Sequence, residues 1–145
     1  MSKVLCVGVA SLDTIVLVEK YPAADERVIA LDTMRAAGGP AMTAAVTLAR
    51  LGVDAALSCV VGDDEAGRFI FDVLKREGID SKNVIVDSTI ATALGTIVVS
   101  KSEETRAIMA RPHNTLPTKP ANISDYSWIH FDHFGVRAMK NWGVA

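Results

Sequence analysis

The sequence predicts an α/β fold in which a doubly wound parallel sheet carries a small antiparallel sheet. Valine-rich apolar runs such as "KVLCVGVA" alternate along the chain with helical patterns. This alternation is typical of parallel strands that helices cover on both faces through right-handed crossovers. Other strand-like segments follow one another with only a polar turn between them, so they predict a second, projecting sheet. With 145 residues, the chain has the size of one ordinary domain.

The first part of the chain is expected to begin with a buried strand at 3–10. A strand pair at 14–19 and 27–34 follows, joined through the polar turn "PAADE". The next segment, from Pro40 to Leu51, is predicted to be a helix because it has proline in its first turn and glycine directly after its end.

The middle of the chain repeats the pattern of a buried strand followed by a helix. The strand is expected at 55–62 and the helix at 63–78, where apolar residues recur on one face. Asp63 or Asp64 can cap the first amides of this helix. A short strand is expected at 83–87.

The last part of the chain begins with a hairpin of 95–100 with 105–109 around the polar turn "KSEE". A proline-rich surface connection at 111–125 and a buried strand at 127–135 should follow. The segment 136–145 is expected to start as a helix and then stop.

Composition limits the function classes. Hydrophobic residues make up 50% of the chain and the formal net charge is -2, which gives no electrostatic reason to expect nucleic acid or an anionic membrane as a partner. Cys6 and Cys59 lie in apolar runs without metal-ligand spacing, so they are predicted to be buried thiols, although a disulfide between them stays open. No segment is suited to span a bilayer, and the start "MSKVLCVGV" makes a poor signal peptide, so a cytoplasmic location is expected.

The stretch "RAAGGPAMTAAVTLARLG" places Gly38 and Gly39 directly before a predicted helix start. A helix start presents unpaired amides and the positive end of the helix dipole, which attract oxygen-rich ligands. Glycines at this point remove the side chains that would keep a ligand away from these amides. The alternative is that the two glycines only form a tight turn from strand to helix.

Asp13 is predicted to end the first apolar strand, at the same sheet edge as Gly38 and Gly39. A carboxylate there can accept hydrogen bonds from two neighbouring hydroxyl groups, as sugar recognition requires. The alternative is a turn residue that bonds its own backbone. Because a projecting sheet at this edge would cover the crevice in which open parallel sheets bind ligands, these residues together predict a polyol pocket.

Further polar residues carry weaker predictions. In "HFDH", His130 and Asp132 should point to one face of a strand and His133 to the other, so a metal site is not expected, whereas Asp132 or His133 at a strand end can touch a substrate. Arg106 and Arg111 flank a strand of the projecting sheet and suit either an anionic substrate or the solvent-exposed surface.

The order of "VGVASLD", "AAGGPAMTAAVTLARLG" and "VGDDEAGRFIFDVLKREGID" resembles the amino-terminal half of the ribokinase-like, or PfkB-type, carbohydrate kinases. Within this family the string "GGPAMTAAVTLARLG" is most similar to sulfofructose kinases. The resemblance implies a ribokinase-like α/β domain with a β-sheet lid, at about residues 14–36 and 92–110, and transfer of the γ-phosphoryl group of ATP to a sugar hydroxyl.

By position, the resemblance implies that Asp13, Gly38 and Gly39 bind the sugar. Thr43 stands where many family members have asparagine, which changes the sugar contact expected there. With Arg106 added for an anionic group on the sugar, these five residues are the expected substrate-binding set.

The resemblance also implies that the catalytic aspartate, the anion hole and most of the pocket for ATP and Mg²⁺ belong to a carboxyl-terminal half, which has no match in residues 1–145. The chain is therefore expected to be the substrate-binding portion of one domain, with no catalytic residue, metal site or bound ATP of its own, and to be inactive alone. Self-association through the lid or through an exposed sheet edge is expected.

Two other functions are alternatives to a kinase. The chain can be a non-catalytic sugar-binding or assembly module. A dinucleotide-binding dehydrogenase domain fits less well, because "GVASLD" lacks the G-x-G-x-x-G fingerprint that should follow the first strand.

Overall fold

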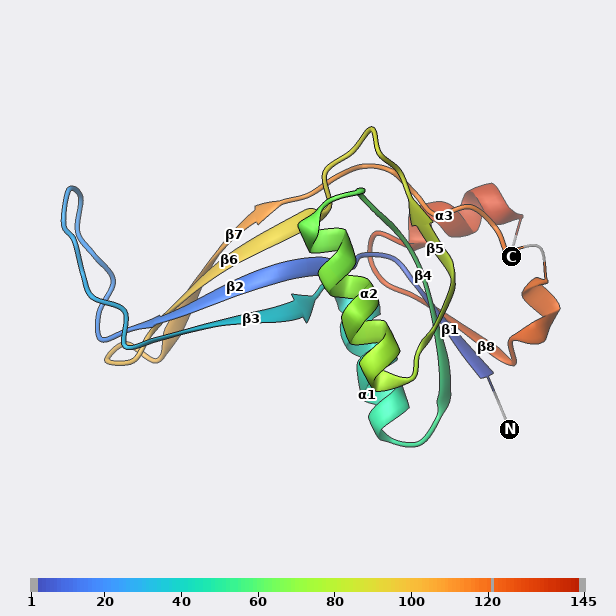
Figure 1. Cartoon of the computed structure of the whole chain (residues 1–145), viewed down its shortest axis with the longest axis horizontal. Helices are drawn as coiled ribbons and strands as arrows, with labels where there is room; N and C mark the ends of the chain where they lie inside the picture. The colour runs from blue at the N-terminus through green and yellow to red at the C-terminus, as the bar shows by residue number, and fades with distance from the viewer. Residues whose placement is uncertain (1–2, 121, 144–145) are drawn as a thin grey trace.

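The computed structural model describes residues 3–120 and 122–143, which form two four-stranded sheets (Figure 1). The main sheet is parallel throughout, in the order β5-β4-β1-β8. Its strands are β1 (Lys3–Val7), β4 (Asp54–Val61), β5 (Asp80–Val86) and β8 (Trp128–Phe131). Residue 121 of the predicted connection and residues 144 and 145 of the predicted last segment lie outside the described residues.

The second sheet extends away from the main sheet and is called the projecting sheet below (Figure 1). It has the order β3-β2-β6-β7. Its strands are β2 (Ser11–Val18), β3 (Asp32–Gly38), β6 (Ala93–Ser100) and β7 (Thr105–Arg111). The predicted α/β class and the presence of a separate small sheet are therefore confirmed.

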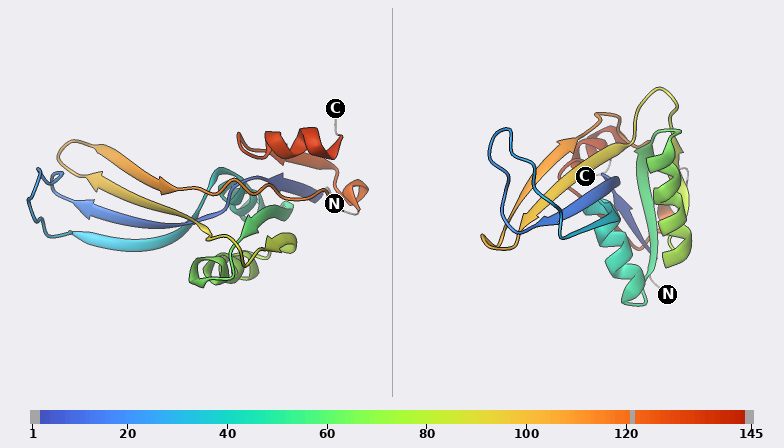
Figure 2. Two further views of the ribbon diagram at one scale, coloured as in Figure 1. Left: turned by 90° about the horizontal axis from the view of Figure 1, so that it is seen from above. Right: turned by 60° about the vertical axis from the view of Figure 1, so that its left-hand side comes forward.

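Helices cover both faces of the main sheet, as Figure 2 shows. Two of them, α1 (Pro40–Arg50) and α2 (Glu65–Glu77), pack on the face that carries Leu57 and Val61, and α3 (Val136–Trp142) packs on the face that carries Leu5 and Val7. A short 3₁₀ turn at Ile123–Asp125 supports the second face. None of the described helices is long and apolar enough to cross a membrane.

The two cysteines are buried and free, so the disulfide that the sequence left open is not formed. Burial raises the pKa of Cys6 to about 11. Burial, followed by the charge of Asp132, raises the pKa of Cys59 to about 12. Both thiols are therefore protonated and act as small apolar core residues.

The first strand is shorter than predicted. It ends at Val7 rather than Ala10, and Gly8 follows with a φ of +150°, a conformation that side-chain-bearing residues rarely adopt. The chain then enters the projecting sheet at Ser11, so Asp13 is the third residue of β2 and does not end the first strand. The apolar run "VLCVGVA" continues past the end of β1, so hydrophobicity alone does not mark the point at which the chain leaves the main sheet.

The projecting sheet is mixed rather than purely antiparallel. Its outer pairs, β2 with β3 and β6 with β7, are antiparallel as predicted, but the central pair of β2 with β6 is parallel. The two central strands follow β1 and β5, whose carboxyl ends lie at one edge of the main sheet, so both leave that edge in the same direction. The first predicted pairing, 14–19 with 27–34, is also shifted, because β2 pairs with 32–38.

Asp64 caps α2 and also fixes the base of β6. Its Oδ1 atom accepts hydrogen bonds from the Gly67 N–H at 2.8 Å and from the Thr92 hydroxyl at 2.6 Å. Its Oδ2 atom accepts the Thr92 N–H at 2.9 Å. The capping predicted for this aspartate is confirmed, and the cap also joins α2 to the segment that leads into the projecting sheet.

We expect Asp64→Ala to lower the free energy of unfolding by about 1–2 kcal/mol, because the α2 cap and the bonds to Thr92 are lost together. The matched control is Asp63→Ala, which removes an exposed carboxylate that has only a 3.5 Å ion pair with Arg68 and should change stability by less than about 0.5 kcal/mol. Urea unfolding measures both. Equal losses in the two variants would contradict this role for Asp64.

Asp64 should also contribute to the acid sensitivity of the fold. Burial raises the pKa of Asp64, but the hydrogen bonds from Thr92 and Gly67 outweigh it, so the pKa lies below its ordinary value of 3.8. A carboxyl with a lowered pKa in the folded state stabilises the fold above the unfolded-state pKa, and this contribution is lost as the pH falls through the folded-state pKa. Asp64→Asn should therefore lose less stability than the wild type between about pH 6 and about pH 3 in urea unfolding.

Candidate functional site

Asp13 lies where the projecting sheet leaves the main sheet. It is half-buried in β2, where it pairs with Ala36 of β3 on one side and with Gly95 of β6 on the other. A Cβ atom added to Gly38 would overlap the Oδ2 atom of Asp13, and one added to Gly95 would lie 2.5 Å from its Oδ1 atom. The carboxylate therefore occupies the space that two absent side chains leave. The Ser11 hydroxyl donates to its Oδ1 atom at 2.9 Å.

The start of α1 is only partly open to a ligand. The Ala41 N–H donates to Asp132 at 3.2 Å and the Met42 N–H donates to the Val9 carbonyl at 3.3 Å. Pro40 has no N–H. These contacts therefore leave the Gly39 N–H as the amide at this helix start that neither of them uses. The predicted row of free amides is thus reduced to the Gly39 N–H, which follows the residue, Gly38, that lies against Asp13.

Gly39 is required here by its conformation. Its φ is +88°, and a Cβ atom would overlap the Val9 carbonyl oxygen. Gly38 and Gly39 therefore do make the tight strand-to-helix turn that the sequence offered as an alternative, and in the same place they bring α1 next to Asp13.

A cleft of about 960 Å³ runs between α1 and the projecting sheet. Gly39 and Thr43 line it from α1, and Arg106 lines it from β7. Asp13 lies on the same face of the projecting sheet as Ile97, another lining residue, because side chains alternate along β2 and β6 in register. Of the five predicted substrate-binding residues, Gly39, Thr43 and Arg106 line this cleft, whereas Asp13 and Gly38 do not. Asp13 shares the cleft face of the projecting sheet with Arg106, which lies farther out along it.

Three other polar residues lie elsewhere. Arg111 donates to the Thr92 carbonyl at 3.1 Å and points to the opposite face of the projecting sheet from Asp13. His133 is exposed, and Asp132 is buried with its carboxylate directed at backbone amides. Across residues 3–120 and 122–143, no three His, Cys, Asp or Glu side chains gather in a way that suits a metal ion.

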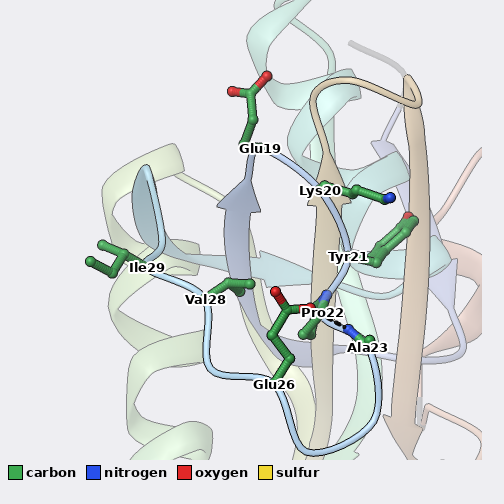
Figure 3. A pocket seen from close by; sticks show the side chains of 8 residues that line it. All are labelled: Glu19, Lys20, Tyr21, Pro22, Ala23, Glu26, Val28 and Ile29. Atoms are coloured by element: carbon green, nitrogen blue, oxygen red, sulfur yellow. Dashed lines mark hydrogen bonds between the residues drawn. The ribbon is translucent and has the colours of Figure 1, made fainter.

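A separate pocket lies at the tip of the projecting sheet, in the loop between β2 and β3 (Figure 3). Tyr21 borders it, and the Tyr21 hydroxyl lies 3.2 Å from the Thr105 hydroxyl. The Ala23 N–H donates to Glu26 at 2.8 Å and closes the loop. This pocket shares no lining residue with the cleft that Gly39 and Arg106 border.

The sequence reasoning missed Gly95 and the role of Asp132. Gly95 stands alone inside the strand pattern "ATALGTIVVS", and an isolated glycine in a strand is a known sign of a close approach by another group. Asp132 had no such signal, because its partners are distant in the sequence.

Comparison with known proteins agrees with this fold. The profile described as "pfkB family carbohydrate kinase" matches residues 1–140. A fructokinase of Klebsiella pneumoniae is 34% identical over 99 residues, which are 64% of this chain and 32% of that protein. An ATP-dependent ribose-1-phosphate kinase of Halopiger xanaduensis is 31% identical over 140 residues, covering 97% of this chain and 47% of that protein.

Among solved structures, an Agrobacterium tumefaciens protein with a provisional ribokinase assignment is similar at a TM-score of 0.82 and 31% identity, covering 90% of this chain and 44% of that one. The chain thus spans less than half the length of these relatives. Because the family profile covers nearly the whole chain, the chain belongs to the pfkB family of carbohydrate kinases.

Proposed function

We propose that this chain is the acceptor-binding portion of an ATP-dependent sugar kinase. The observation that carries the proposal is the pairing of the Asp13 carboxylate, held between Gly38 and Gly95, with the Gly39 N–H at the start of α1. Fructokinase and ribose-1-phosphate kinase, the names of two relatives, agree with a sugar as the acceptor.

Each group in the site has a distinct role in this proposal. The carboxylate of Asp13 accepts hydrogen bonds from two neighbouring sugar hydroxyls, and the Gly39 N–H donates to a sugar oxygen. The Thr43 hydroxyl adds a contact from the next turn of α1. Arg106 is suited to an anionic substituent, such as the phosphate of a sugar phosphate, through charge-assisted hydrogen bonds.

We further propose that ATP with Mg²⁺ is the co-substrate and that the groups acting on it come from outside residues 1–145. Phosphoryl transfer requires donors that stabilise the transferring group and a base that orients the attacking hydroxyl. Asp13, Gly39, Thr43 and Arg106 suit the acceptor rather than the transferring phosphoryl group. In this proposal the projecting sheet acts as a lid over the sugar, and the protein works in the cytoplasm.

Association into a homo-oligomer is part of the same proposal. Met34 and Ile108 are each 55% exposed on the cleft side of the projecting sheet, and Trp128 on the edge strand β8 is 71% exposed. Apolar side chains and open strand edges of this kind favour pairing with another chain. Light scattering of the purified chain measures the state, and a monomer at high concentration would contradict the expectation.

The test of the proposed function has two arms. The purified chain is titrated with ribose, fructose, fructose 6-phosphate and sulfofructose while its ¹H–¹⁵N spectrum is recorded, and at least one sugar should shift the Gly39 and Gly95 amide signals. ATP-dependent phosphorylation is then assayed with this chain and with a polypeptide extended by the downstream coding sequence. We expect activity only in the extended polypeptide. No shift with any sugar and no activity in either polypeptide would refute the proposal.

A further inference from the structure

We propose that Asp132 is a positioning residue of the sugar site. It holds the start of α1, and with it the Gly39 amide, in place against the connection between β1 and β2 that leads to Asp13. The inference rests on the proposed function, because it concerns the same site. Asp132 itself does not line the cleft and acts through the backbone that it holds.

The carboxylate of Asp132 is bonded entirely to backbone. Its Oδ2 atom accepts the Val9 N–H at 2.8 Å and the Ala41 N–H at 3.2 Å. Its Oδ1 atom accepts the Phe134 N–H at 2.9 Å and the Gly135 N–H at 2.6 Å. A carboxylate has about four lone-pair sites, so these four donors use all of them. With a residue exposure of 5%, Asp132 is directed away from a substrate and toward the protein frame.

The surrounding backbone is shaped to admit this carboxylate. A Cβ atom on Gly8 would overlap the carboxyl group of Asp132, and the Gly8 φ of +150° turns the chain around it. The two peptide groups that flank the Cα atom of Val9 are then both held, because the Val9 N–H donates to Asp132 and the Val9 carbonyl accepts the Met42 N–H of α1. Gly39 in turn lies against this carbonyl, too close for a side chain.

These contacts connect the two halves of the sugar site. β2 begins at Ser11, two residues after Val9, and carries Asp13. The first turn of α1 carries Gly39 as its N-cap residue. The carboxylate of Asp132 bonds both Val9, which leads into β2, and Ala41 of α1. It therefore sets the distance between β2, which carries Asp13, and the start of α1, which carries the Gly39 N–H.

Asp132 also replaces a missing helix cap. The α1 helix has no side-chain cap from its own N-cap residue and no acidic residue in its first turn. The cap comes instead from a residue 91 positions away from Ala41, and its negative charge offsets the positive end of the helix dipole. The start of α1 therefore depends on a contact with the segment that follows β8.

The test compares Asp132→Asn with Asp64→Asn. The first variant replaces one acceptor oxygen by an NH₂ group that must face a backbone N–H. The second makes the same change at the carboxylate that caps α2, which bonds Gly67 and Thr92 and makes no contact with the start of α1. Sugar affinity is measured by titration well below the unfolding temperature of each variant, using the best sugar from the panel above. Asp132→Asn should bind at least about tenfold more weakly than the wild type, because the donor and acceptor are displaced, whereas Asp64→Asn should stay within about twofold.

The amide signals separate positioning from general destabilisation. Asp132→Asn should move the Gly39 and Ala41 signals and speed their hydrogen exchange, whereas Asp64→Asn should leave both unchanged. Sugar binding by folded Asp132→Asn with wild-type affinity would overturn the inference. If this variant does not fold, Asp132→Glu, which keeps the charge but shifts the carboxylate by one methylene, is tested against the same criterion.

Failure of the proposed function gives a different result. If the wild type binds no sugar at all, the function is wrong, and the positioning role is judged from the spectra alone. A Gly39 amide signal that does not move in Asp132→Asn then refutes the role, and a signal that moves supports it.

Discussion

Replacement of Asp13 by asparagine is expected to weaken sugar binding about 100-fold while the chain stays folded. The Ser11 hydroxyl donates to the Oδ1 atom of this carboxylate, and the Oδ2 atom, which lies over Gly38, has capacity for sugar hydroxyls. An asparagine offers one acceptor oxygen where aspartate offers two, and it loses the negative charge. Each hydrogen bond to a charged group contributes about 1.5–3 kcal/mol, so the loss of one or two of them gives this size of effect.

The same change should cost little stability. Asp13 is half-buried and makes a single side-chain hydrogen bond, so we expect the free energy of unfolding to change by less than about 1 kcal/mol. Affinity is measured by calorimetric titration and stability by urea unfolding. Asp32→Asn is the matched control, because Asp32 lies on the same face of the projecting sheet near its tip and is exposed. Binding of sugar by Asp13→Asn within a few-fold of the wild type would show that Asp13 is not the hydroxyl acceptor.

The sequence was sufficient for the parts of the fold that depend on local patterns. Proline in the first turn and glycine after the last turn marked α1, and Asp63 or Asp64 was expected to cap α2, of which the structure uses Asp64. Gly38 and Gly39 were also predictable from a local pattern, because two glycines directly before a helix indicate a backbone conformation or a close contact that a side chain would prevent.

Features that depend on distant contacts were not predictable in this way. The change from the main sheet to the projecting sheet occurs inside one apolar run, and only the contact of Gly8 with Asp132 shows why the strand ends there. The parallel pairing of β2 with β6 joins residues about 80 positions apart, and periodicity along one strand does not specify its neighbour. Asp13 was therefore expected at the end of the first strand, whereas it is the third residue of β2.

Replacement of Gly39 by alanine is expected to lower the free energy of unfolding by about 3 kcal/mol or more. With φ +88° and ψ 141°, Gly39 lies outside the left-handed helical region, in a conformation that costs alanine about 1–3 kcal/mol in its own right. The added Cβ also overlaps the Val9 carbonyl oxygen, and this carbonyl cannot move freely because Asp132 holds the N–H of the same residue. The two effects should add, because one is conformational and the other is steric.

Gly52→Ala is a control for a positive φ without a steric overlap. Gly52 ends the turn after α1 with a φ of +80°, close to that of Gly39, but a Cβ atom there meets no atom within 4 Å. Its replacement should therefore cost only the conformational part, about 1 kcal/mol. Urea unfolding of the two variants measures the difference, which contains the overlap of the added Cβ with the Val9 carbonyl and the cost of the Gly39 ψ of 141°. A loss in Gly39→Ala no larger than that in Gly52→Ala would mean that this peptide gives way easily, and the rigid spacing between Gly39 and Asp13 on which the sugar site depends would then not exist.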